Sequence, residues 1–93
     1  MRRAARVDEN QAEIVAALRQ IGASVQSLAS VGCGCPDLLI GLRGRNCLLE
    51  IKNPKQDASH RRLTPDEEGF LKCWRGQYAV VMTVEQAIRE VTK

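Results

Sequence analysis

Residues 36–52 read PDLLIGLRGRNCLLEIK, two apolar runs that are separated by the short polar turn Arg43-Gly44-Arg45-Asn46. A glycine-containing turn between two β-rich runs predicts a hairpin. We expect its strands over Pro36–Leu42 and Asn46–Lys52. Because side chains alternate along a strand, this hairpin decides which residues enter the core and which face outward.

The alternation sorts the side chains of the hairpin onto two faces. With Gly44 and Arg45 as a two-residue turn, the apolar residues pair on the first face: Leu38 with Ile51, Ile40 with Leu49 and Leu42 with Cys47. The second face then carries Asp37 opposite Lys52, with Glu50 diagonal to Asp37 at a Cβ–Cβ distance of about 6 to 8 Å. A register shift of two residues preserves this sorting, whereas a shift of one residue would scatter the apolar set.

The flanking segments predict further helices and strands. Apolar residues at helical spacing, from Ile14 to Ile21, and the segments Thr64-Pro65-Asp66-Glu67 and Thr83-x-x-Gln86 are typical of helices and their N-terminal caps. We expect a helix capped by Asp8 or Asn10 and ending at Gly22, a strand over Ser24–Ala29, a polar loop over 53–63, a helix from Thr64 to about Trp74, a strand over Gln77–Thr83 and a helix to about Val91. The order αβββαβα predicts an α/β fold with a mixed sheet and helices on its faces.

Asp37, Glu50 and Lys52 are the candidate catalytic residues. Hydrolysis of a phosphodiester needs a hard cation, held by oxygen ligands, that neutralises developing charge and lowers the pKa of a water. Two carboxylates and the backbone carbonyl of Ile51 supply such ligands for Mg²⁺ or Mn²⁺. The ammonium of Lys52, two residues from Glu50 on the same face, would orient the water or stabilise the transition state. The competing interpretation is a solvated outer face of a sheet edge.

The same residues resemble a known signature. Pro36-Asp37, followed after a short interval by Glu50-Ile51-Lys52, is similar to the PD-(D/E)xK signature of the restriction-endonuclease-like superfamily. Over nearly the whole chain, three stretches resemble the stand-alone VRR-Nuc domains of bacteria and their viruses: Val31-Gly32-x-Gly34-x-Pro36-Asp37-Leu38-Leu39, Leu49-Glu50-Ile51-Lys52, and Leu63-Thr64-Pro65-Asp66-Glu67 followed by Trp74-x-Gly76.

This resemblance implies a restriction-endonuclease-like core with a four-stranded mixed sheet. It also implies Mg²⁺- or Mn²⁺-dependent cleavage of branched, Holliday-junction-like DNA by a homodimer. The family uses an acid of its first helix as a further metal ligand, which corresponds to Glu13, with Glu9 as the alternative. Relatives often have glutamine near the position of Glu67, where this chain has Glu67-Glu68.

Basic residues near the motif are candidate DNA contacts. Lys55, Arg61 and Arg62 follow the second strand of the hairpin, and Arg43 and Arg45 lie at its turn. Arg2, Arg3 and Arg6 form a basic N-terminal arm. Each has a competing interpretation as a solubilising surface charge.

Size and composition narrow the function classes. A chain of 93 residues predicts one domain, 1–93, and its net charge of +3 does not by itself identify a nucleic-acid-binding protein. One Phe, one Tyr and one Trp give little material for stacking single-stranded bases. So short a chain also leaves little room for base-reading insertions, which disfavours a sequence-specific restriction enzyme. A catalytically silent DNA-binding or scaffold module stays as the alternative to a nuclease.

The four cysteines and the charged start favour a reducing, cytoplasmic location. The first nine residues lack the apolar segment of a secretory signal, and no apolar run approaches the ~20 residues that cross a bilayer. Cys33-x-Cys35 lacks the spacing of a zinc knuckle. Cys47 alternates with apolar neighbours and is expected to be a small buried hydrophobe.

Overall fold

The structure is a computed structural model that describes residues 9–93. Its elements are α1 (Glu9–Gln20), β1 (Ser24–Ser27), β2 (Leu38–Leu42), β3 (Arg45–Ile51), α2 (Ala58–Arg61), α3 (Pro65–Cys73), β4 (Tyr78–Val81) and α4 (Val84–Val91). The predicted αβββαβα order is confirmed, with the short helix α2 added inside the segment that we expected to be a loop. The predicted basic arm of Arg2, Arg3 and Arg6 and the cap at Asp8 lie outside the described residues.

The four strands form one mixed sheet in the order β1-β2-β3-β4. Strand β2 pairs with β1 and β3 in antiparallel fashion, and β4 joins β3 in parallel through the crossover that contains α2 and α3. Two parallel strands need such a crossover, because the chain must return to the end of the sheet where the first strand began before it can start the second. The predicted mixed sheet is thereby confirmed.

The predicted register of the hairpin is wrong by two residues. Leu38 pairs with Leu49, and Leu42 with Arg45, so the turn consists of Arg43 and Gly44. Both turn residues have positive φ, 56° and 78°, as a type I′ turn requires, and glycine fits the second of these positions without strain. Because the shift is by two, the sorting of side chains onto two faces is unchanged.

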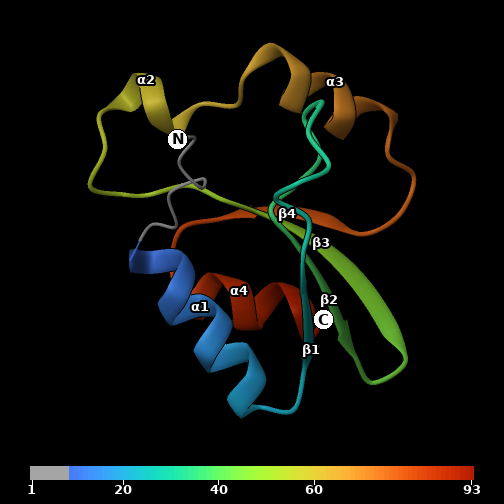
Figure 1. The fold of residues 1–93 in the computed structure, drawn as a ribbon. Helices are drawn as coiled ribbons and strands as arrows, with labels where there is room; N and C mark the ends of the chain where they lie inside the picture. The colour runs from blue at the N-terminus through green and yellow to red at the C-terminus, as the bar shows by residue number, and fades with distance from the viewer. Residues whose placement is uncertain (1–8) are drawn as a thin grey trace.

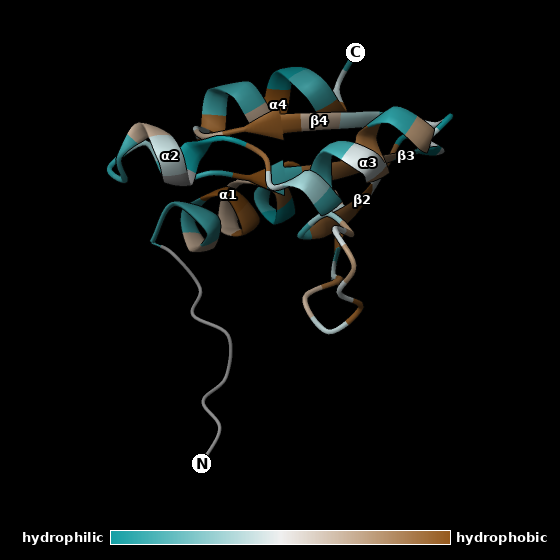
Figure 2. Ribbon diagram, turned by 90° about the horizontal axis from the view of Figure 1, so that it is seen from above, coloured by the Kyte–Doolittle hydropathy of each residue, from teal (hydrophilic) through white to brown (hydrophobic). Residues whose placement is uncertain are grey.

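The first face of the sheet forms the hydrophobic core. Leu38, Ile40, Leu49 and Val81 are at most 1% exposed, and α1 and α4 pack together over them. Figure 1 shows these two helices side by side below β4, and Figure 2 shows hydrophobic residues concentrated in the strands and on the helix sides that meet them. Cys47 lies in this core, as expected, and all four cysteines are free thiols.

The helix caps differ in detail from prediction. At α3 the capping box is complete: the Thr64 hydroxyl accepts from the Glu67 N–H, and the Glu67 carboxylate accepts from the Thr64 N–H. At α4 only half of the predicted box forms, because the Gln86 side chain accepts instead from the N–H of Met82. Among residues 9–93, no helix combines the length and apolar character needed to traverse a bilayer.

Helix α3 lies at one end of the second face, against the loop between β1 and β2 (Figure 1). Gly34 of this loop has φ +80°, and a Cβ atom there would overlap the backbone of Asp66 and Glu67. Gly32, also at positive φ, has open space at the same position. The close approach at Gly34 therefore fixes the first turn of α3, and with it Glu67, relative to the sheet.

Gly34→Ala is expected to destabilise the protein by about 2–5 kcal/mol, since strain at positive φ adds to a backbone overlap. Gly32→Ala is the matched control, because it adds the same strain without the overlap and should cost about 1–2 kcal/mol. Urea unfolding of both variants measures the difference. Equal losses would show that the packing of Gly34 against α3 contributes nothing.

Candidate active site

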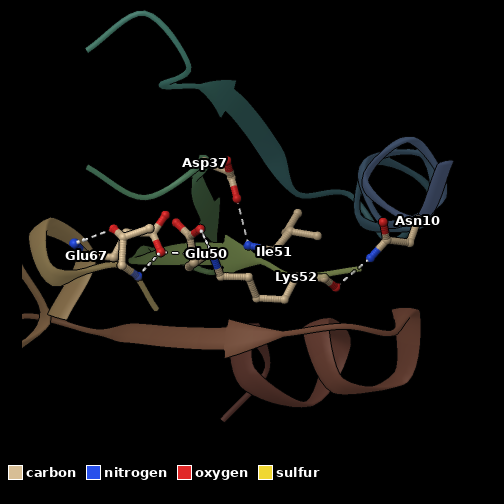
Figure 3. A network of polar contacts seen from close by, with 7 residues as sticks. Asn10, Asp37, Glu50, Ile51, Lys52 and Glu67 are labelled. Carbon is tan, nitrogen blue, oxygen red and sulfur yellow. Dashed lines mark hydrogen bonds and ion pairs between the residues drawn. The ribbon is translucent and has the colours of Figure 1, made fainter. Parts of the chain in front are cut away.

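The second face carries the candidate active site at the end where β2 begins and β3 ends. Asp37 directly precedes β2, and the register places it opposite Glu50, one step beyond the pair Leu38–Leu49. The sequence predicted Asp37 opposite Lys52 and diagonal to Glu50, so the corrected register brings the two acids into direct opposition. Figure 3 shows Asp37, Glu50 and Lys52 converging at this end of the hairpin.

Asp37 is held by the backbone of both neighbouring strands. Its Oδ2 accepts from the N–H of Ile51 at 2.7 Å, and its carbonyl accepts from the N–H of Leu28 at 2.9 Å. Ile51 therefore contacts Asp37 through its backbone. The contact made is through its N–H, while the predicted ligand role of its carbonyl stays a prediction.

Glu50 is a buried carboxylate, only 4% exposed. Its Oε2 lies 3.4 Å from the Lys52 ammonium. Burial, followed by the nearby charges of Asp37 and Glu67, raises its pKa from 4.5 to about 8, although Lys52 opposes the shift. Burial and the neighbouring acids therefore favour the protonated form of Glu50 up to about pH 8.

Lys52 is held by contacts to its side chain and to its backbone. Its Nζ donates to Glu67 Oε1 at 2.9 Å, and its backbone carbonyl accepts from Asn10 Nδ2 at 2.8 Å (Figure 3). Burial lowers the pKa of Lys52, but the hydrogen bond to Glu67 and the charge on Glu50 outweigh this and raise it. The lysine is therefore a charged, positioned donor.

Glu67 also belongs to this cluster, although the sequence did not assign it a role there. Its Oε1 accepts from both Lys52 Nζ and the Thr64 N–H, each at 2.9 Å. Burial opposes ionisation, but the hydrogen bonds from Lys52 and Thr64 lower the pKa of this carboxyl overall. The Thr64-x-x-Glu67 spacing revealed the cap, whereas only the packing of α3 reveals the contact with Lys52.

Asn10 and Tyr78 are two further residues that sequence reasoning missed as site residues. Asn10 was a candidate cap, but it lies inside α1 and donates to the carbonyls of Lys52 and Met82 instead. The Tyr78 hydroxyl is buried and has no hydrogen-bond partner among residues 9–93. Burial and the charges of Glu50 and Glu67 raise the pKa of Tyr78 to about 12, so it faces the acids as a neutral phenol.

The remaining predicted residues lie apart from this cluster. Glu13 is exposed and lines a pocket of about 130 Å³ together with Glu9 and Lys55. Lys55 pairs weakly with Glu9 at 3.7 Å, with both side chains more than 80% exposed. Arg61 and Arg62 are exposed at the end of α2. The roles of Glu13 and of these basic residues stay predictions.

No ready-made metal centre of three grouped histidine, cysteine or acidic side chains occurs within residues 9–93. Comparisons with protein-family models, with curated proteins and with solved structures returned no match.

The raised pKa of Glu50 predicts that stability falls as pH rises from about 5 to 8. In this range the folded protein keeps a proton that the unfolded chain, with a carboxyl pKa of 4.5, has released. The stabilisation is complete below pH 4.5 and is lost as pH rises through about 8, by about 1.4 kcal/mol per pH unit at most.

Urea unfolding in chelator at pH 5.5 and pH 8 measures this slope. Glu50→Gln has no proton to release, so it should flatten the slope and match or exceed the stability of the unsubstituted protein at pH 8. A slope that is unchanged in Glu50→Gln would assign the pH dependence to another group.

Proposed function

We propose that this chain is a metal-dependent DNA endonuclease of the VRR-Nuc type, within the PD-(D/E)xK superfamily, with Asp37, Glu50 and Lys52 as its catalytic residues. One observation carries the proposal: a buried carboxylate, Glu50, directly faces a second acid across β2 and β3 and lies beside a positioned lysine. Burying such a group is costly unless a partner compensates it, so a purely structural origin is disfavoured.

The donor set fits a divalent cation. Asp37 and Glu50 offer carboxylate oxygens, and Ile51 offers a main-chain carbonyl at the end of β3, all hard ligands of the kind that Mg²⁺ and Mn²⁺ prefer. Burial, followed by the charges of Asp37 and Glu67, disfavours the ionised form of Glu50, and a bound cation would favour that form. When bound, the metal would polarise the phosphoryl group and lower the pKa of a water.

Lys52 would act on the attacking water or on the negative charge of the transition state. Its ammonium is already oriented by Glu67 and Glu50, and Asn10 fixes its main chain, so no rearrangement is needed at the moment of reaction. We assign Glu67 and Asn10 as positioning residues, because they act through Lys52. Tyr78 adds a neutral phenolic donor on the same face.

We propose branched DNA as the substrate and a homodimer as the active form. Within residues 9–93 the sheet carries no inserted element that could read base edges, so recognition by shape and phosphate contacts is favoured over sequence readout. Two identical sites at a fixed separation would cut two strands of a junction symmetrically, whereas one site would nick.

Cleavage of labelled DNA tests the catalytic assignment. Purified protein should cut a four-way junction in Mg²⁺ or Mn²⁺ and not in chelator. Asp37→Asn, Glu50→Gln and Lys52→Met should each reduce the rate on the order of 100-fold or more, because each removes charge from the reacting centre. Arg89→Gln, an exposed change on α4, controls for handling and charge.

Cleavage that persists in chelator or in all three site variants would overturn the mechanism. Equal cleavage of junction, flap and linear duplex would remove the proposed preference for branched DNA while leaving the nuclease assignment. DNA binding without cleavage in either metal would instead identify a catalytically silent module.

Metal addition should raise the melting temperature more at pH 8.5 than at pH 6. At the lower pH the cation must displace the proton that Glu50 holds, and this competition weakens binding. Thermal unfolding with Mg²⁺, with Mn²⁺ and with chelator measures the shift, and Asp37→Asn should abolish it. A metal-induced shift that survives in Asp37→Asn would place the cation elsewhere.

A further inference from the structure

A hollow of about 360 Å³ lies at the opposite end of the sheet, between the β2–β3 turn and the start of β1. Three of its lining residues stand side by side on three strands, because Ser24 pairs with Gly41 and Gly41 pairs with Asn46. By strand alternation these three positions belong to the second face, the face that carries Glu50. The hollow and the acidic cluster therefore share one surface of the sheet.

Gly41 creates the floor of the hollow. A Cβ atom at this position would lie 3.5 Å from Asn46 Oδ1 and 3.8 Å from Ser24 Cβ, so the missing side chain leaves room between two polar neighbours. Within the described part of the chain, the side chains of Ser24 and Asn46 make no hydrogen bond. Their hydroxyl and amide groups are thus available to a ligand.

Two arginines border the hollow. Arg43 and Arg45 are exposed, and neither forms an ion pair with any residue of the range 9–93. The guanidinium of Arg45 donates at 2.8 Å to the Gln77 side chain when that amide is oriented with its oxygen toward the arginine. Two uncompensated cations beside neutral donors favour an anion with several acceptor oxygens, which is the chemistry of a phosphate group.

The spacing along β3 relates this hollow to the acids. Asn46 and Glu50 are four residues apart on one strand and one face, which corresponds to about 13 Å. Phosphates of one strand in B-form DNA rise about 3.4 Å each along the helix axis and also turn around it, so neighbouring phosphates lie roughly 7 Å apart and 13 Å spans about two nucleotides. A DNA strand with one phosphate at the acids would therefore place another phosphate near the hollow.

We propose that the hollow bordered by Arg43, Arg45, Ser24, Gly41 and Asn46 is a phosphate subsite for the DNA backbone. It fixes the strand about two nucleotides from the bond that is cut. The subsite rests on the proposed nuclease function for its role, but its affinity for phosphate is a property of the hollow alone.

Binding of DNA in chelator, where no cleavage occurs, tests the subsite. Arg43→Asn together with Arg45→Gln removes both charges, and asparagine suits the positive φ of the turn. Fluorescence anisotropy over a series of salt concentrations should show the slope of log Kd against log salt reduced by about two, one for each lost phosphate contact. Arg89→Gln, on the opposite face, controls for lost charge and should keep the slope of the unsubstituted protein.

A second experiment uses inorganic phosphate and no DNA. Phosphate should shift the NMR amide signals of Gly41 and Asn46 in the unsubstituted protein, compared with chloride at equal ionic strength. Gly41→Val should reduce these shifts without changing charge, because valine fills the floor and suits a strand. Its thermal unfolding confirms that it folds, and Arg45→Gln supplies an independent variant.

The outcomes separate the two proposals. An unchanged salt slope in the double variant, or phosphate shifts that are absent or survive in both Gly41→Val and Arg45→Gln, would overturn the subsite even if the protein cuts DNA. A reduced slope and specific shifts support the subsite, and if that protein fails to cut in either metal, only the nuclease proposal falls.

Discussion

The antiparallel pairing of β2 with β3 is the constraint on which the rest of the structure depends. It collects the apolar side chains of both strands on one face, which α1 and α4 cover to form the core. The same alternation leaves Glu50 on the opposite face and places Asp37 across from it. Successive side chains along each strand point to opposite faces. The register that assembles the core on one face therefore also brings the two acids together on the other.

Lys52 is the cation beside the buried acid pair, and residues of two other elements hold this lysine in place. Lys52 directly follows β3, the first turn of α3 contributes Glu67, and Asn10 of α1 ties the main chain of Lys52 to that of Met82, directly after β4. Glu67 serves two purposes, since the same carboxylate oxygen caps α3 and accepts from Lys52. The stability of that helix end and the geometry of the candidate site are therefore coupled through one side chain.

The two ends of the second face differ in charge. Acids gather where β3 ends, while Arg43 and Arg45 lie uncompensated at the turn where it begins. A phosphodiester chain presents both a group that a metal can polarise and neighbouring phosphates that cations can hold, so such a surface suits it along its length. Under the proposed function, one strand of the sheet would set the distance between the reacting phosphate and the anchored one.

The sequence alone determined the element order and which hairpin residues share a face, because period-two alternation and capping chemistry are local properties. It also singled out Asp37, Glu50 and Lys52 as candidate site residues. It misplaced the turn by one residue and the strand pairing by two, since pairing shifts of two leave the apolar pattern equally satisfied and only the closing geometry of Arg43 and Gly44 selects between them. Tertiary structure alone decided the burial of Glu50 and the entry of Asn10 and Glu67 into the site. These features depend on where α1 and α3 dock on the sheet. Docking is set by long-range packing, such as the contact of Gly34 with the start of α3, and no local sequence pattern encodes it.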